Sequence, residues 1–452
     1  MSLNNSKDLI KSNVIRKPNK LIYSKKYFLI VLLFLLAIFQ SNNLFGSAPN
    51  ADFSVDNTTP VVDETVEFTV DLEGADTWNW NFGDGAVPAT ADTQGPHDVS
   101  YSTPGLKTVF LTASNGNSND TETKENYIRV FENYYFTGDG DPANTTSWNT
   151  EPDGTGEAPT NITGDCLNFI IQNGHTMTTT GTWTLGEYSS IQIEDGVLNE
   201  DHAISIDPTG SLQVDDDGRL NHNVNSLSIF TGTETLADNS AINYGDNGEQ
   251  DIADLNYGNL ILSGEATKTL QGDVTVANDL TIENNTTLNT GNNTLSADAA
   301  QSTASFSMGD GAEFNVEGAF VSSYDYNNIN LDDNSTVSYL DADQAVASAP
   351  YGNLVIDGGG TIQGDVRVNT SLNLVDGNLA TGAGTNNITI APDGTISENG
   401  GFSETRMIEC DGEGNLIKEG DNLSDLEMVY PVGSGGTYSP VEVNSLSGTI
   451  NG

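Results

Sequence analysis

The chain has few basic side chains: 15 Lys and Arg stand against 64 Asp and Glu in 452 residues, for a formal net charge of −49. Seven of the 15 lie before residue 27, where Asp8 is the only acid, so the rest of the chain carries 8 basic and 63 acidic residues. A surface this acidic repels nucleic acid and anionic membranes, because every phosphate contact needs a cation. Nucleic acid is therefore not expected as a partner.

Cysteine and histidine are also scarce. Cys166 and Cys410 lie too far apart for a metal-type spacing, so we expect buried free thiols, with a long-range disulfide left open. The four histidines form no H-E-x-x-H or H-x-H arrangement, and no G-x-S-x-G elbow or phosphate-binding Gly-Lys loop occurs. The sequence therefore predicts no catalytic centre, and His175, which follows Asn-Gly, is expected in a turn. The histidines are His97, His175, His202 and His222.

The acidity has two interpretations, solubility in salty water and calcium binding, and both can hold. The best calcium candidates are the consecutive carboxylates Asp215, Asp216 and Asp217. With Arg219 nearby, the same cluster is the only local group that fits the alternative function, a calcium-assisted β-helix polysaccharide lyase or glycosidase. A solvated turn between coils is the simpler interpretation of this cluster.

An unbroken apolar run, Tyr27 to Phe39, follows Lys25 and Lys26. Thirteen residues match the core of a signal peptide better than a membrane span, which needs about 20. Small residues follow at Gly46–Ala48. We therefore expect residues 1–48 to be a signal peptide, with an uncleaved anchor as the alternative, and the rest of the chain to be secreted or at the cell surface. Any membrane contact would come through this segment alone.

Residues 49–132 show short runs in which apolar and polar side chains alternate, the pattern of half-buried strands. Between the runs lie turn sequences such as Gly83-Asp84-Gly85 and Asn115-Gly116. About 80 residues with strands this short predict a β-sandwich. The alternating apolar sets are Val66, Phe68 and Val70; Trp78, Trp80 and Phe82; and Val109, Leu111 and Ala113.

Two motifs in this region, WNFGDG at Trp80–Gly85 and YSTPGLKTVFLTASNG at Tyr101–Gly116, resemble those of the polycystic kidney disease (PKD) domain. The resemblance implies an immunoglobulin-like fold that serves on secreted proteins as a spacer or as a module contacting proteins and glycans. For Trp80 we expect a place in the core, and for Asp84 a hydrogen bond to its own turn. The motif residues with structural roles are Trp80, Phe82, Gly83, Asp84, Gly85, Tyr101, Pro104 and Gly105.

The chain from residue 133 onward is repetitive. Tyr257-Gly-Asn-Leu-Ile-Leu recurs 94 positions later as Tyr351-Gly-Asn-Leu-Val-Ile, and flanking markers recur at offsets of 95 and 92. Three markers at nearly one offset indicate a duplication, with one repeat at 239–333 and the next at 334–428. Residues 133–238 form the opening region of the repetitive part, and 429–452 read as the start of a further β unit that is cut short.

Strand-sized pieces within each repeat, such as Leu280-Thr-Ile and Thr287-Leu-Asn, are too short to bury their own apolar side chains and must stack on neighbours. The sequence thus predicts an all-β chain in which the sandwich is followed by a parallel β-helix, or solenoid. Chained antiparallel sandwiches are the alternative, because the spacing of the pieces is irregular. The repeats and the closing segment Tyr430–Val441 resemble large bacterial surface proteins, many exported by type IX secretion, whose usual C-terminal sorting domain is not seen.

These features predict a non-catalytic protein with a structural or adhesive role outside the cell. The sandwich would be a spacer or contact domain and the solenoid a stalk, with an extracellular glycan or a surface protein as partner. Ice binding, suggested by the threonines between Thr176 and Thr184, is disfavoured because they do not recur at a fixed period.

Overall fold

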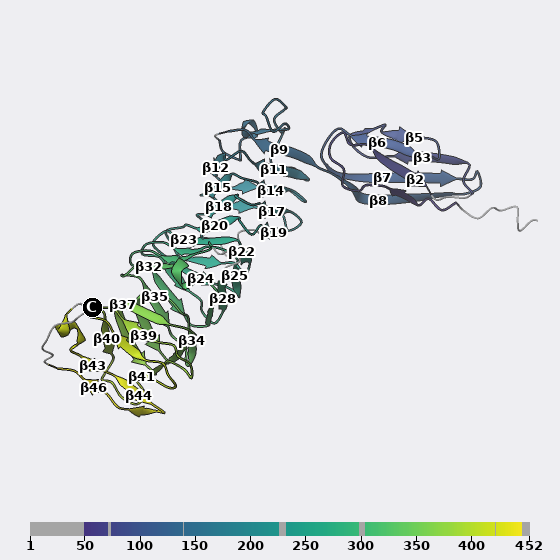
Figure 1. Cartoon of the computed structure of the whole chain (residues 1–452). Helices are drawn as coiled ribbons and strands as arrows, with labels where there is room; N and C mark the ends of the chain where they lie inside the picture. The colour runs from purple at the N-terminus through teal and green to yellow at the C-terminus, as the bar shows by residue number, and fades with distance from the viewer. Residues whose placement is uncertain are drawn as a thin grey trace, which may run out of the picture.

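The computed structural model describes residues 49–70, 74–138, 140–225, 232–297, 303–420 and 422–444. These residues form an N-terminal sandwich and a long stack of coils, each with its own hydrophobic core. Figure 1 shows the sandwich at one end of an elongated molecule and the coils following one another along it. The expected signal peptide at 1–48 lies outside the described residues, and so does the end of the last predicted unit, 445–452.

The sandwich consists of two antiparallel sheets. One contains, in spatial order, β1 (Phe53–Val55), β2 (Val66–Val70), β6 (His97–Tyr101) and β4 (Ala86–Val87). The other contains β5 (Thr90–Ala91), β3 (Thr77–Asn81), β7 (Gly105–Ser114) and β8 (Asn119–Val130). The predicted alternation is confirmed: Val66, Phe68, Val109, Leu111 and Ala113 are all buried in the core between the sheets, and Trp78 packs at its edge.

The remaining chain winds as a parallel solenoid with three faces, so the alternative of chained antiparallel sandwiches is wrong. Face 1 contains β9 (Glu132–Phe136), β11 (Leu167–Ile171), β14 (Ser190–Ile193), β17 (Ser211–Val214), β19 (Thr233–Leu236), β22 (Asn256–Tyr257), β25 (Val274–Val276), β28 (Thr294–Ala297), β31 (Ala319–Ser322), β34 (Gln344–Val346), β36 (Gly360–Ile362), β38 (Leu379–Ala380), β41 (Ile408–Glu409) and β44 (Val432–Ser434).

Face 2 contains β12 (Thr176–Thr178), β15 (Val197–Glu200), β18 (Arg219–His222), β20 (Ala241–Tyr244), β23 (Asn259–Leu262), β26 (Leu280–Ile282), β29 (Phe306–Met308), β32 (Ile329–Leu331), β39 (Ile388–Ile390) and β42 (Leu416–Lys418). Face 3 contains β13 (Trp183–Thr184), β16 (Ile204–Ser205), β21 (Gln250–Ile252), β24 (Thr267–Leu270), β27 (Thr287–Asn289), β30 (Glu313–Val316), β33 (Thr336–Tyr339) and β40 (Thr395–Glu398). Two long strands bend from face 2 into face 3: β35 (Pro350–Asp357) and β37 (Val366–Asp376).

Antiparallel pairs occur at the two ends of the described solenoid. β10 (Trp148–Asn149) pairs with β9 at the start, and at the far end β45 (Thr437–Tyr438) pairs with β44 and β43 (Val429–Tyr430) with β46 (Val441–Glu442). Three short 3₁₀ turns complete the elements: η1 (Thr145–Ser147), η2 (Tyr326–Asn328) and η3 (Leu423–Leu426).

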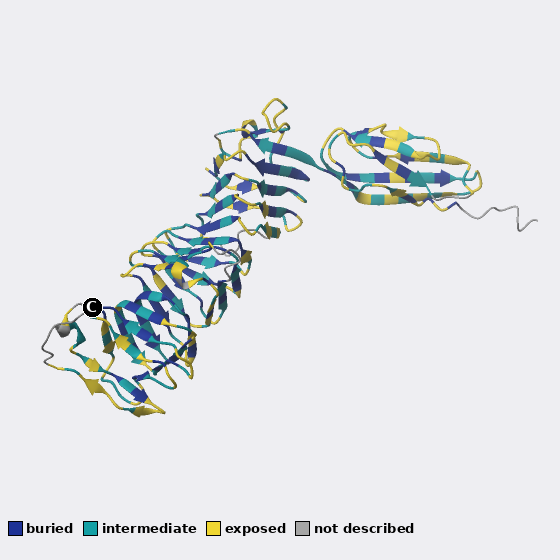
Figure 2. Ribbon diagram, viewed as in Figure 1, coloured by how far each residue is buried: buried dark blue, intermediate teal, exposed yellow. Residues whose placement is uncertain are grey.

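Short strands form here because each buries every second side chain against its neighbours along the stack. In β25, Val274 and Val276 are buried while Thr275 faces outward, and β26 repeats the pattern with Leu280 and Ile282. Figure 2 shows this alternation of buried and more exposed residues along the strands. No strand of three residues covers its own apolar atoms, so each coil depends on the coils above and below it.

The two sequence repeats are turned by one face relative to each other. Tyr244 ends β20 on face 2, but its counterpart Tyr339 ends β33 on face 3. Likewise β23, which follows Tyr257, lies on face 2, whereas the equivalent part of β35 pairs with β33 on face 3. The duplicated stretch therefore corresponds to a whole number of coils plus one further face, and equivalent residues point in different directions around the solenoid.

The sandwich is joined to the solenoid through a nearly continuous strand. β8 ends at Val130 and β9 begins at Glu132, so Phe131 alone separates the last strand of the sandwich from the first strand of face 1. Phe131 is itself held, because its N–H donates to Pro60 O at 2.8 Å and its carbonyl accepts from Val62 N at 2.9 Å. The backbone thus has no unpaired linker between the two regions.

Candidate functional site

The aromatic motif residues of the sandwich are core residues. Trp80 and Phe82 are fully buried and their rings stack 5.2 Å apart. The indole N–H of Trp80 donates to Thr93 O at 3.1 Å, and the buried Tyr101 hydroxyl donates to Phe82 O at 2.9 Å. Burying an aromatic side chain stabilises the fold by about 2–3 kcal/mol. None of these three rings is available to stack on a sugar.

The side chain that stabilises the Gly-Asp-Gly turn is Asn81, not Asp84 as we predicted. Asn81 Oδ1 accepts from Gly83 N at 2.9 Å, whereas Asp84 is exposed, and its charge acts on the ammonium of Lys107. Gly83 has φ +94°, and a Cβ there would lie 2.8 Å from Thr108 O. Only glycine fits this turn without strain.

The second motif, Tyr101–Gly116, contains a buried lysine, Lys107. Lys107 Nζ donates to Thr103 Oγ1 and to Pro104 O, both at 3.1 Å. Burial lowers the pKa of Lys107, and the Asp84 charge opposes that effect. Gly105, with φ +108°, starts β7. Pro104 and Gly105 thus shape the turn that receives the lysine.

The structure does not bring Asp215, Asp216, Asp217 and Arg219 together as a site. Asp215 accepts from the side-chain amides of Gln192 and Gln213, and Asp216 from Asn239 N. Arg219 Nε instead donates to Asn221 Oδ1 at 2.7 Å. Within the described residues, no group of three or more His, Cys, Asp or Glu side chains is arranged to hold a metal ion. Calcium binding stays a prediction.

Three histidines have structural partners near the surface. His97 Nε2 lies 2.9 Å from Thr93 O, and His202 Nδ1 lies 3.1 Å from Thr179 O. His175 sits in a turn, as expected, with its N–H donating to Gln172 O. Cys166 and Cys410 are free thiols; the first is buried and the second half-buried.

Sequence reasoning missed a buried ionisable pair. His222 Nδ1 lies 2.6 Å from Glu200 Oε2, and both side chains are almost completely enclosed in the solenoid. They are 22 positions apart but occupy paired places on β15 and β18. Only knowledge of the coil length could have found this pair. Because it is sealed from solvent, we assign it a structural role.

Lys268 is a second polar feature that the sequence did not reveal. Its ammonium group lies inside the solenoid wall, 2.6 Å from both Asp246 O and Gln250 Oε1. Burial lowers the pKa of Lys268 to about 8, although the Asp246 charge opposes the shift. A similar arrangement recurs at Lys418, whose Nζ contacts the carbonyl oxygens of residues 391, 392 and 394. These ammonium groups are occupied by backbone oxygens and are not free for a ligand.

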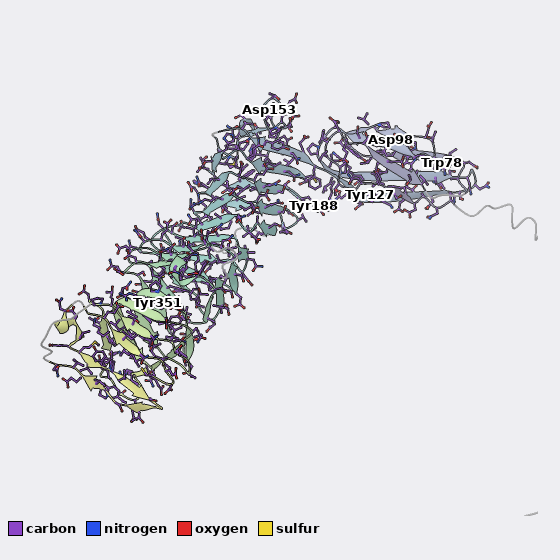
Figure 3. All side chains as sticks on the ribbon, in the orientation of Figure 1. Trp78, Asp98, Tyr127, Asp153, Tyr188 and Tyr351 are labelled. Atoms are coloured by element: carbon purple, nitrogen blue, oxygen red, sulfur yellow. The ribbon has the colours of Figure 1, made fainter. Side chains whose placement is uncertain are left out.

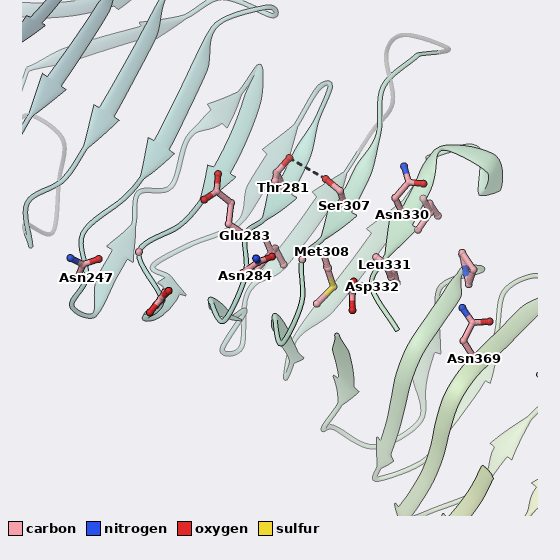
Figure 4. A pocket seen from close by; sticks show the side chains of 16 residues that line it. Asn247, Thr281, Glu283, Asn284, Ser307, Met308, Asn330, Leu331, Asp332 and Asn369 are labelled. Atoms are coloured by element: carbon pink, nitrogen blue, oxygen red, sulfur yellow. Dashed lines mark hydrogen bonds between the residues drawn. The ribbon is translucent and has the colours of Figure 1, made fainter. Parts of the chain in front are cut away.

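A hollow of the described surface lies at the corner between faces 2 and 3, where the ladder of face 2 is interrupted. It has a volume of about 1000 Å³, and we call it the face-2 groove. It is lined by residues 247, 264, 265, 281–284, 307–309, 329–332, 350 and 369. Figure 4 shows its polar side chains, with Asn330 and Asp332 on one side and Asn369 across from them.

One comparison with known proteins concerns the sandwich. The PKD domain family matches residues 51–128. These residues form a PKD domain. No curated protein matches the chain. One solved structure, described as "Structural basis for the promiscuous specificity of the carbohydrate-binding modules from the beta-sandwich super family", is 28% identical over 22% of this chain and 39% of that one, with a TM-score of 0.18. The chain thus spans well under half of that protein.

The PKD domain indicates the kind of protein to which the chain is similar. PKD domains are typical of extracellular proteins, and a PKD domain followed by a β-solenoid fits a structural or adhesive role. Among the described residues, no helix has the length and apolar character required to span a bilayer.

Proposed function

We propose that this protein is a non-catalytic extracellular stalk with an adhesive role, in which the PKD domain and the solenoid act as one stiff unit. The observation that supports this proposal most strongly is the junction, where a single residue separates β8 of the PKD domain from β9 of the solenoid. A spacer that swings freely needs a linker without backbone partners, and Phe131 has partners on both its N–H and its carbonyl.

Side chains reinforce this junction. The Arg129 guanidinium lies 4.8 Å from the centre of the Tyr188 ring, so a PKD residue packs on a solenoid residue. Figure 3 labels Tyr188 at the part of the solenoid that meets the PKD domain. The N–H of Glu132 donates to the carbonyl of Cys166 at 3.1 Å. Burial raises the pKa of the Cys166 thiol to about 11, while the charges of Arg129 and Lys107 oppose the rise.

The absence of catalysis is part of the proposal. The carboxylates and the arginine considered for a lyase have separate partners, as described above, and the buried His222–Glu200 pair has no path to a polymer. Contact with a glycan or a surface protein would therefore be made by shallow, extended surfaces of the stalk.

Small-angle scattering of the chain from residue 49 onward tests the stiff unit. The expected profile is that of one extended particle, matched by a single arrangement of the PKD domain and the solenoid. A compact particle, or a profile that requires many domain orientations, would contradict the proposal. In parallel, polysaccharides incubated with the protein are assayed for new reducing ends and unsaturated products. Any product would move the function to the lyase or glycosidase class.

A further inference from the structure

The face-2 groove owes its position to one proline. β32 is the last strand of the eight-stranded sheet that begins with β12 on face 2, and the next coil reaches this face at Pro350, the first residue of β35. Pro350 is paired with Arg367 of β37, but it has no N–H to donate to β32 on its other side. Among the described residues, β32 accordingly has a ladder partner on one side only, β29. The stack opens at this point, and the groove forms beside it.

A row of polar side chains runs into the groove. Thr281, Ser307 and Asn330 are paired in register on β26, β29 and β32, so they lie about 4.8 Å apart, one per strand. Further up the same row, Asn221 Nδ2 donates to Asn199 Oδ1 at 2.7 Å, and Asn199 Nδ2 to Thr178 Oγ1 at 3.0 Å. Those upper residues thus satisfy one another.

The groove residues have more unused hydrogen-bonding capacity. Thr281 and Ser307 are joined by one long contact of 3.3 Å, which Figure 4 marks. Asn330 is exposed, and its amide has no hydrogen bond within the described part of the chain. A ligand lying along this row would meet one polar group per strand spacing, a distance close to the length of one sugar unit in an extended glycan.

The negative charge of the groove favours uncharged glycans over anionic ones. Glu265, Glu283 and Asp332 line it and are exposed, and its lining contains no Lys, Arg or His. A polymer of uronate or sulfate groups would be repelled, whereas sugar hydroxyls donate well to carboxylates in charge-assisted hydrogen bonds.

We propose that the face-2 groove binds a linear, uncharged, hydroxyl-rich polysaccharide, laid along the solenoid across β26, β29 and β32. This inference rests on the proposed adhesive function and specifies its partner. The lining has no aromatic side chain to stack on a sugar, so a single site binds weakly, and tight attachment to a surface needs many protein copies.

The test measures binding of the chain from residue 49 onward by affinity electrophoresis in gels that contain a neutral β-glucan, xylan or mannan, alginate, or no polymer. Poly-lysine binding is measured separately as a probe for basic polypeptides. The variants are Asn330→Ala and Glu283→Gln. Their matched controls are Asn399→Ala and Glu404→Gln, which change exposed residues that do not line the groove.

We expect retardation by at least one neutral polysaccharide, little change with salt, and a loss of affinity of about tenfold in each groove variant but not in the controls. Retardation by alginate alone, binding of poly-lysine alone, equal losses in the controls, or no retardation would overturn the inference. Scattering on the same samples separates this failure from failure of the stalk, because an extended particle without glycan binding leaves the proposed stalk intact.

Discussion

The hydroxyl groups of Tyr244 and Tyr257 lie 2.8 Å apart inside the solenoid, and both belong to a closed set of hydrogen bonds around one alanine. The Ala253 N–H donates to the Tyr244 hydroxyl, and the Tyr257 hydroxyl donates to Ala253 O. Tyr244 must therefore supply the hydrogen between the two rings. In the second repeat, Tyr339, Tyr351 and Ala347 form the same set. The tyrosine that begins each repeated Tyr-Gly-Asn-Leu sequence is therefore needed for hydrogen bonding inside the solenoid.

Replacing Tyr257 with Phe should destabilise its coil by about 1–3 kcal/mol, because buried partners lose a hydrogen bond and no water replaces it. Tyr351→Phe should have a similar effect, and the two losses should add because the sets are separate. Hydrogen exchange of the neighbouring coils and urea unfolding measure the change. Tyr135→Phe, which removes a hydroxyl without a described hydrogen bond, should alter neither. Equal protection in all three variants would contradict the structural role.

Alkaline pH should weaken the solenoid through the same tyrosines. Burial raises the pKa of Tyr244 from its ordinary value of 10 to about 12, and that of Tyr257 well above 10. A folded-state pKa above the unfolded value means that the stabilisation is complete below pH 10 and is lost as pH rises towards 12. Absorbance at 295 nm and circular dichroism, followed together, should show these tyrosines ionising only as structure is lost. Because the chain has 15 tyrosines, the parent chain is compared with Tyr244→Phe and Tyr257→Phe. A smaller absorbance rise near pH 10 in these variants than in the intact parent would exclude the enclosed environment.

Lys268 should make the solenoid more stable, not less, as pH rises, and it should do so at a lower pH than the tyrosines. Its pKa is about 8 in the folded chain and 10.5 as a free side chain, so the folded state binds the proton less tightly than the unfolded state. The stability contribution of this residue should therefore rise as pH increases from about 8 to 10. Comparing Lys268→Met with the parent chain across this range isolates the effect. The difference between the two chains should change with pH, and a constant difference would refute the assigned pKa.

Arg129→Ala should loosen the junction without unfolding either region. A partly exposed cation–π contact contributes about 0.5–1 kcal/mol, and the backbone bonds of Phe131 persist in this variant. Scattering or distance measurements between labels on the PKD domain and the solenoid should show a broader distribution with the same mean. Arg406→Ala, which changes an arginine far from the junction, is the control. An unchanged distribution would mean that the backbone hydrogen bonds of Phe131 and Glu132 fix the arrangement without the side-chain contact.

Removal of calcium should leave the thermal midpoint unchanged at low ionic strength. The carboxylates of Asp215 and Asp216 already accept hydrogen bonds from different groups, and the described residues contain no convergent ligand set. Melting with and without a chelator measures this directly. A drop in the midpoint on chelation would support calcium binding, and Asp215→Asn should then reproduce the drop.

The sequence predicted the PKD domain well because its signals are local. Alternation in Val66–Val70 and the turn at Gly83 each involve a few neighbouring residues, and a sandwich follows from them. The parallel solenoid followed from pieces too short to fold alone. The role of Asp84 was predicted less accurately, because the side chain that accepts from the turn's backbone, at Gly83 N, is that of Asn81 and not that of Asp84.

The groove and the buried pairs could not be predicted because they depend on coil length. Paired residues Asn353 and Ser371 are 18 positions apart, whereas Thr281 and Ser307 are 26 apart. With coils this uneven, the sequence does not reveal that Glu200 meets His222, or that Pro350 falls on face 2 and interrupts its ladder. These relationships appear only when the register of every coil is known.

The one-face turn between the repeats sets how a longer version of this stalk would grow. Each further copy of the 94-residue unit would present its own surface a third of a revolution from the previous copy, and only the fourth copy would return to the orientation of the first. Copies added in tandem would therefore present equivalent surfaces on all three faces around the solenoid axis, so that partners could bind from any side.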